Sequence, residues 1–356
     1  MDINVSDREF RLYQGKPDVL YQNMMMCRDK SWLAVYKNRL SRKEMLCACL
    51  HDLLPGLLED AQGRYLSMEL SDWASHDLYE YRFFEGSFEE KMAFMQRLLA
   101  EGEPVFVGTV HPLLPFSARY NPNLDQEAYQ KPNHIFVILG EEAGRYVYFD
   151  TSSYKSAAFE PYPGNPELGW IQKETVDAVL QKLFQLGYVV WHEENRAHLE
   201  TYAQRLLADF VQAYEQKSPE KSYLVSEGDG QPGMEGFWFR GRKAIADLQR
   251  HLMREDLDLS AASWEFDFID QGDLLNWKVT DLATRRKLMA MWLAEANRTE
   301  EAQLWTEAAG LWNRLSTFLL YRREKGKYGS HPRYGRILEE ILAQEDKIYA
   351  FLKNFA

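Results

Sequence analysis

Residues 132–140 read PNHIFVILG and residues 145–150 read RYVYFD, with the linker EEAG between them. The apolar run 135–139 is typical of a strand buried on both faces of a sheet, and the linker is typical of a hairpin turn. His134 therefore begins one strand and Asp150 ends the next. Because antiparallel neighbours bring these two positions to the same end of a sheet, we expect the imidazole and the carboxylate to lie close together.

A histidine beside a carboxylate is the orienting half of a nucleophilic triad, so a nucleophile is expected elsewhere in the chain. Cys27 stands at the start of a helical pattern in which Trp32, Leu33, Tyr36 and Leu40 fall on one face. Unpaired N–H groups and the helix dipole favour negative charge at a helix start, which lowers the pKa of a thiol placed there. Cys27 is therefore the candidate nucleophile.

Cys27, His134 and Asp150 follow one another in the chain order of papain-like thiol enzymes. In this interpretation Cys27 attacks a carbonyl carbon, His134 acts as general base and acid, and Asp150 orients the imidazole. The oxyanion that forms needs hydrogen-bond donors. The backbone N–H of Cys27 is one candidate, and the side-chain amide of Gln22 or Asn23 is a second.

The composition limits the class of protein. The chain has 356 residues, is 46% hydrophobic and carries a formal net charge of −12, which indicates one or two packed domains and argues against nucleic acid or an anionic membrane as partner. No apolar run approaches the roughly 18 residues of a membrane span, and residues 1–9 lack the pattern of a signal peptide. Three cysteines do not make a disulfide framework. We therefore expect a cytoplasmic, reduced protein without a metal site.

The order of predicted elements divides the chain at about residue 195, giving an α+β domain over 1–195 and an all-helical domain over 196–356. The first domain is predicted to contain strands at 65–70, 79–84, 104–110 and 188–191, and helices at 42–59, from a capping box at Ser87 to 101, and at 173–186. The second is predicted to contain helices at 197–216, 241–254, 280–297, 300–323 and 333–354, with a loop over 217–236.

The segments PVFVGTVHPLLPF at 104–116, NHIFVILG at 133–140 and VYFD at 147–150 resemble the butirosin biosynthesis protein H family. The segment GRKAIADL at 241–248 also resembles a recurring segment of that family's C-terminal region. The resemblance covers 20–195 loosely and is most specific over 104–150. Where the family has an aspartate after its first strand and a tyrosine in the following turn, this chain has His111 and Phe116.

The resemblance implies a papain-like N-terminal domain, followed by a helical domain that lines or covers the acceptor cleft. It also implies acyl transfer in natural-product biosynthesis. The acyl group would pass from phosphopantetheine on an acyl or peptidyl carrier protein, through the cysteine, to a small-molecule amine. No cofactor would be bound to the chain itself. A second copy of the chain, in a homodimer, is a further partner to consider.

The sequence leaves several alternatives open. The same triad could hydrolyse a thioester or amide, or the chain could be a non-catalytic member that binds a peptide or carrier protein. Cys27 could be an ordinary buried thiol, as we expect for Cys47 and Cys49. His111 could line the acyl pocket or merely end a strand. The basic segment 322–327 could meet an acidic carrier protein or form a solvated helix end.

Overall fold

The computed structural model describes residues 27–36, 40–68, 76–117, 119–121, 123, 132, 134–151, 158–182, 185–224, 234–260 and 270–354. The chain divides into two compact units. The first unit comprises Met1–Met45 and Trp73–Arg196, and the second comprises Leu46–Asp72 and Ala197–Ala356. The sequence predicted a single change of domain at 195, whereas here the segment 46–72 groups with the C-terminal half.

The first unit is built on a seven-stranded antiparallel sheet. In sheet order its strands are β3 (Tyr79–Phe84), β9 (Gln185–Trp191), β4 (Val105–Thr109), β5 (His134–Glu142), β6 (Arg145–Phe149), β8 (Asn165–Gln172) and β7 (Pro161–Tyr162). Strands β4 and β5 lie inside the sheet, and both are rich in fully buried aliphatic residues. This agrees with the prediction of a buried strand over 135–139.

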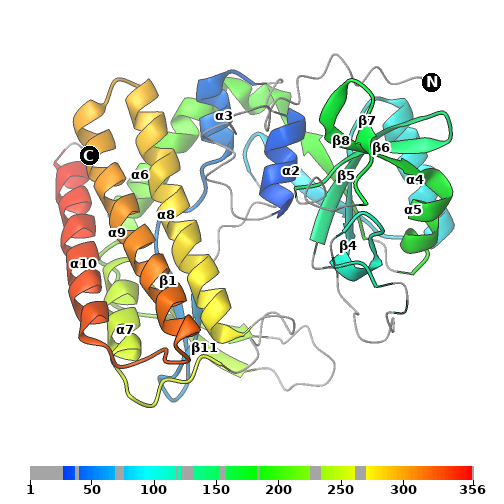
Figure 1. The fold of residues 1–356 in the computed structure, drawn as a ribbon. Helices are drawn as coiled ribbons and strands as arrows, with labels where there is room; N and C mark the ends of the chain where they lie inside the picture. Colours follow the sequence, from blue (N-terminus) through cyan, green and yellow to red (C-terminus); the bar gives the residue numbers. More distant parts are fainter. Residues whose placement is uncertain are drawn as a thin grey trace. The chain divides into compact units, whose positions relative to one another are not determined.

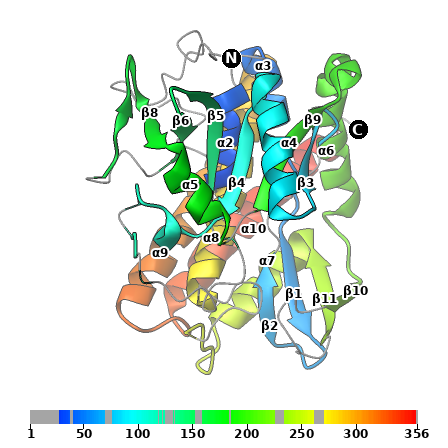
Figure 2. The same cartoon turned by 90° about the vertical axis from the view of Figure 1, so that its right-hand side faces the viewer.

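Helices cover both faces of this sheet, as Figures 1 and 2 show. Helices α4 (Phe88–Ala100) and α5 (Lys173–Leu180) lie on one face, and α2 (Cys27–Tyr36) lies on the other. The predicted capping box is confirmed, because Ser87 Oγ accepts from the Glu90 N–H and Glu90 accepts from the Ser87 N–H. Helix α5 ends at Leu180, so the predicted helix to 186 was wrong there, and β9 begins at Gln185.

The second unit combines helices with a smaller sheet. Its long helices are α6 (Leu199–Ala213), α7 (Gly241–Leu252), α8 (Gln271–Glu295), α9 (Thr299–Glu324) and α10 (Pro332–Lys353). In Figure 1, α8, α9 and α10 run side by side from yellow to red. The four-stranded antiparallel sheet contains β10 (Glu220–Leu224), β11 (Met234–Arg240), β1 (Gly56–Asp60) and β2 (Tyr65–Met68), in that order. The chain passes between the units three times, within α3 (Arg42–Ala48), between Asp72 and Trp73, which lie outside the described residues, and within the 3-10 helix η6 (Glu193–His198).

This smaller sheet corrects the prediction of an all-helical C-terminal domain. The predicted loop 217–236 contains β10 and the start of β11, and the predicted helix 42–59 ends at Ala48 and gives way to β1. Pro55, directly before β1, cannot continue a helix. Strand β11 pairs with β1 from Gly56 opposite Arg240 to Asp60 opposite Gly236. The two paired strands are far apart in the sequence, so no local sequence pattern predicts that they pair.

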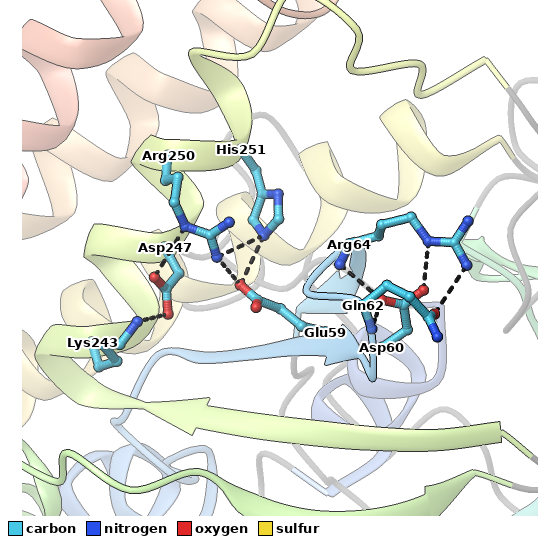
Figure 3. A network of polar contacts seen from close by, with 8 residues as sticks. All are labelled: Glu59, Asp60, Gln62, Arg64, Lys243, Asp247, Arg250 and His251. Atoms are coloured by element: carbon cyan, nitrogen blue, oxygen red, sulfur yellow. Dashed lines mark hydrogen bonds and ion pairs between the residues drawn. The ribbon is translucent and has the colours of Figure 1, made fainter.

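A polar network around the buried side chain of Glu59 joins α7 to β1 in the second unit (Figure 3). Glu59 Oε1 accepts from Arg250 Nη2 at 2.5 Å and lies 2.8 Å from His251 Nε2. Asp247, one turn earlier on α7, contacts both Lys243 and Arg250. Because Glu59 is buried and ionic, it requires such partners, and together they fix α7 against the strand.

Within the described parts of the chain, no helix has the length and apolar character needed to cross a membrane.

The helical core of the second unit contains a fully buried ion pair. Arg286 on α8 donates from Nε to Glu345 Oε1 on α10 at 2.8 Å, and from Nη2 to Glu345 Oε2 at 3.2 Å. Trp312 Nε1 on α9 donates to the same Glu345 oxygen at 2.7 Å. Neither charged side chain has any exposed surface. The carboxylate of Glu345 on α10 therefore forms hydrogen bonds with both α8 and α9.

Glu345→Ala should lower the free energy of unfolding by about 3–5 kcal/mol, because it leaves the Arg286 charge buried without its partner. Glu340→Ala on the same helix removes a partner from the exposed pair with Arg314 and should change stability by no more than about 1 kcal/mol. Urea unfolding followed by circular dichroism measures both. Equal effects of the two substitutions would contradict the role given to Glu345 in joining the helices.

Candidate active site

His134 and Asp150 meet at one end of the β5–β6 hairpin. His134 is the first residue of β5, and Asp150 directly follows β6, in which Phe149 pairs with Val137. His134 Nε2 lies 2.5 Å from Asp150 Oδ2, and each side chain is only 2% exposed. The carboxylate therefore fixes the imidazole ring, and Nδ1 is the ring nitrogen left for another partner.

The other partner of the imidazole is the sulfur of Cys27. This residue opens α2, and the helix is held on the sheet by the rings of Trp32 and Tyr36, which pack against Tyr79, Trp191 and Phe106. The thiol of Cys27 hydrogen-bonds with the side chain of His134, and the backbone N–H of Ile135 donates to the sulfur. The structure thus brings Cys27, His134 and Asp150 together in one chain of contacts.

The surroundings of Cys27 favour its thiolate. Burial of the sulfur, the largest single influence, raises the pKa of the thiol. The hydrogen bond and positive charge of His134 and the N–H of Ile135 outweigh burial, although the charge of Asp150 opposes them, so the net pKa lies below the usual thiol value of 9.0. The residue as a whole keeps partial solvent exposure. A partly exposed cysteine residue whose thiol has a lowered pKa is typical of a nucleophile.

His134 is shifted in the opposite direction. Burial would lower the pKa of the imidazole, but the hydrogen bond and charge of Asp150, followed by those of Cys27, raise it to about 10. The lowered pKa of the thiol and the raised pKa of the imidazole both favour a thiolate beside an imidazolium, and Asp150 stabilises the positive ring. This pair can attack an electrophilic carbon and then return a proton to a leaving group.

A second imidazole lies against the first. His111 begins the short 3-10 helix η3 (His111–Leu113) that follows β4, and its ring stacks on His134 with centroids 3.7 Å apart and planes 26° apart. Burial and the positive charge of His134 lower the pKa of His111 to about 4, so His111 is neutral. Its Nδ1 lies 3.5 Å from Ser117 Oγ. His111 thus forms one wall around the imidazolium rather than a separate charged group.

Two contacts in this site were not predicted from the sequence. The contact from the Ile135 N–H is made by the backbone, so the type of side chain does not indicate it. Its position directly after His134 is the one feature of the sequence that could have suggested it. The stacking of His111 follows from the register of β4 on β5, in which Thr109 pairs with His134. That pairing places the residues after β4 beside the start of β5. The predicted oxyanion donors Gln22 and Asn23 lie outside the described residues.

Other residues named from the sequence lie away from this chain of contacts. Cys47 and Cys49 are both buried, as expected. In the basic segment 322–327, Arg323 pairs with Asp273 at 2.5 Å, and Arg322 donates to the carbonyl of Gly329. These two arginines are thus engaged within the second unit. Among the described residues, no group of three His, Cys, Asp or Glu side chains is placed to hold a metal ion.

Comparison with models of known protein families found no match. Comparison with curated protein sequences likewise found no related protein. The function of the chain is therefore inferred from the geometry and chemistry of its site.

The rate of Cys27 alkylation by iodoacetamide should reach half its maximum below pH 9, because the thiol pKa is lowered. His134→Ala removes the main source of stabilisation for the thiolate. It should move the midpoint of the profile to higher pH, and each pH unit of that rise above pH 7 should slow the reaction at pH 7 by about tenfold. Mass spectrometry of the Cys27 peptide separates this reaction from those of Cys47 and Cys49. A wild-type midpoint at or above pH 9, unmoved by the substitution, would refute the ion pair.

Removing the ring of His111 should weaken the site, because a stacked aromatic pair contributes about 0.5–1.5 kcal/mol beyond its buried area. His111→Ala should therefore slow alkylation of Cys27 at pH 7 by about two- to tenfold. The control His111→Phe keeps a stacked ring that carries no charge and should stay within about twofold of wild type. If both variants slow the reaction equally, the contribution comes from the imidazole nitrogens and not from stacking.

Proposed function

We propose that this protein is a cysteine-dependent acyltransferase. Cys27 is the nucleophile, His134 the general base and acid, and Asp150 the residue that orients and stabilises the imidazolium. The single observation that carries the proposal is the continuous chain of contacts from the Cys27 sulfur through the His134 ring to the Asp150 carboxylate. This is the residue set that acyl transfer through a covalent thioester requires.

The proposed fold family is papain-like, within the butirosin biosynthesis protein H family that the segments at 104–150 resemble. What supports it is the arrangement of the first unit. The cysteine opens a helix packed on an antiparallel sheet, the histidine begins one strand of that sheet, and the aspartate directly follows the neighbouring strand. The proposed setting, which follows from the same resemblance, is natural-product biosynthesis in the cytoplasm.

The first half-reaction transfers the acyl group to the enzyme. The Cys27 thiolate attacks the thioester carbon of an acyl group carried on phosphopantetheine, and the carbonyl electron pair moves to oxygen to form a tetrahedral oxyanion. When the carbonyl re-forms, the bond to the phosphopantetheine sulfur breaks. His134 gives its proton to that sulfur, so an acyl-Cys27 thioester and a free carrier thiol result. The proposed donor partner is therefore an acyl or peptidyl carrier protein.

The second half-reaction releases the acyl group to an amine. His134, now neutral, accepts a proton from the amine as its nitrogen attacks the acyl-Cys27 carbon. The carbon–sulfur bond breaks, Cys27 leaves as thiolate, and an amide is released. The starting ion pair is restored, so thioester and amine have been exchanged for amide and thiol. Asp150 serves both halves by holding the ring in one orientation.

Hydrolysis is the second candidate. Water in place of the amine would release a carboxylic acid through the same steps, and the partial exposure of Cys27 gives water a way to approach. The choice between the two depends on whether the acceptor excludes water from acyl-Cys27.

The proposal is tested with the acetyl thioester of N-acetylcysteamine as donor and hydroxylamine as a general amine acceptor. Wild-type protein should become acetylated on Cys27 and then release a hydroxamate. Cys27→Ser should lose both products, whereas Cys49→Ser should keep them. Mass spectrometry follows the acyl-enzyme, and chromatography measures hydroxamate against acetate. Hydroxamate in excess supports the transferase, acetate in excess supports the hydrolase, and no acetylation of Cys27 refutes both.

A further inference from the structure

Tyr81 lies on the sheet face that carries α2. It belongs to β3, and its ring meets Phe106 of β4 edge to face, with centroids 5.3 Å apart and planes 84° apart. To reach β4 from β3 the ring crosses β9, the strand between them. Tyr36 of α2 stacks on the same Phe106. The phenol therefore lies between the sheet and the helix that Cys27 begins.

The crossing is possible because β9 has a glycine beneath the phenol. A Cβ built on Gly187 would lie 2.1 Å from the Tyr81 hydroxyl oxygen, well inside van der Waals contact. Gly187 pairs with Phe106 on one side and Phe83 on the other, so it is an interior position of the sheet. Glycine weakens a strand interior and often marks a close approach. Here it leaves room for one polar group, the hydroxyl of Tyr81.

This hydroxyl has no hydrogen-bond partner within the described parts of the chain, although Tyr81 is only 6% exposed. A buried hydroxyl without a partner is unfavourable, and native proteins rarely leave one without a reason. An unpaired hydroxyl in this position is available to form a hydrogen bond with a bound substrate.

Tyr81 also lies near the first turn of α2, which begins with the reactive Cys27. The guanidinium carbon of Arg28, the residue after Cys27, is 6.0 Å from the centre of the Tyr81 ring. Burial raises the pKa of the phenol well above its usual value, and the negative charge of Cys27 adds to this, although Arg28 opposes both. The phenol therefore keeps its proton at neutral pH. It can donate a hydrogen bond, and it is unsuited to act as a base.

We propose that the Tyr81 hydroxyl donates a hydrogen bond to the acyl oxygen while that oxygen carries negative charge in the tetrahedral intermediates on Cys27. The inference rests on the acyl chemistry proposed above and adds a donor to it. The backbone N–H of Cys27, at the start of α2, is the natural second donor. Tyr81 would then be a catalytic residue that touches the substrate oxygen.

Two reactions of the same sulfur separate this role from a structural one. Acetylation by the N-acetylcysteamine thioester passes through an oxyanion, whereas iodoacetamide is attacked at a saturated carbon and forms none. Tyr81→Phe removes only the oxygen and keeps the ring on Phe106. We expect it to slow acetylation of Cys27 by about 10²–10³-fold, the usual effect of losing one oxyanion donor, and to leave alkylation within about twofold.

Two further variants complete the test. Gly187→Ala keeps the hydroxyl but displaces it, and should also slow acetylation more than alkylation. Tyr334→Phe makes the same chemical change in the core of the second unit and should alter neither rate. If wild type is acetylated and Tyr81→Phe is acetylated as fast, the donor role is refuted while the proposed function stands. Equal loss of both reactions would also refute it, because the hydroxyl would then act on the thiolate or the fold.

Discussion

The buried contact between His134 and Asp150 is the constraint on which the rest of the site depends. An imidazolium that is 2% exposed would be strongly disfavoured without a carboxylate at hydrogen-bond distance. The carboxylate stabilises the charged form of the ring. The charged ring in turn stabilises the Cys27 thiolate and so offsets the effect of burying its sulfur, which favours the neutral thiol. His111 stays neutral because its burial, together with the positive charge of the His134 ring stacked 3.7 Å away, lowers the pKa of its imidazole.

The sheet supplies the precision that these interactions need. Residues His134 and Asp150 leave adjacent strands, so backbone hydrogen bonds fix their separation before any side chain is placed. The sulfur comes from a different element, and its position depends on how α2 packs. Trp32 and Tyr36 hold that helix through rings of β3, β4 and β9. A rigid hairpin thus presents the base, and a cluster of aromatic residues positions the nucleophile.

Some features of this site and fold can be predicted from the sequence and others cannot, because only some of them depend on neighbouring residues alone. The apolar run 135–139 and its turn contain the information for a hairpin within a few residues, so the proximity of His134 and Asp150 is predictable. A helix start at Cys27 is likewise a local property. Contacts between distant strands are not local. The predicted helix 42–59 is right only as far as Ala48, and the predicted loop 217–236 is wrong where β10 and β11 lie, because a local pattern does not show which distant strand a segment pairs with.

The charges at the site explain why oxygen-binding groups should matter so much in it. Among the described residues, Cys27 as thiolate and Asp150 carry negative charge, and His134 and the adjacent Arg28 carry positive charge, while His111 and Tyr81 remain neutral. A neutral acyl donor entering this balanced set brings no charge. As the Cys27 electron pair moves onto the carbonyl carbon, the negative charge passes from the sulfur, where His134 and the Ile135 N–H stabilise it, to the carbonyl oxygen. A buried site cannot reorganise water around that oxygen, so donors that are already in place stabilise the transition state more than the ground state.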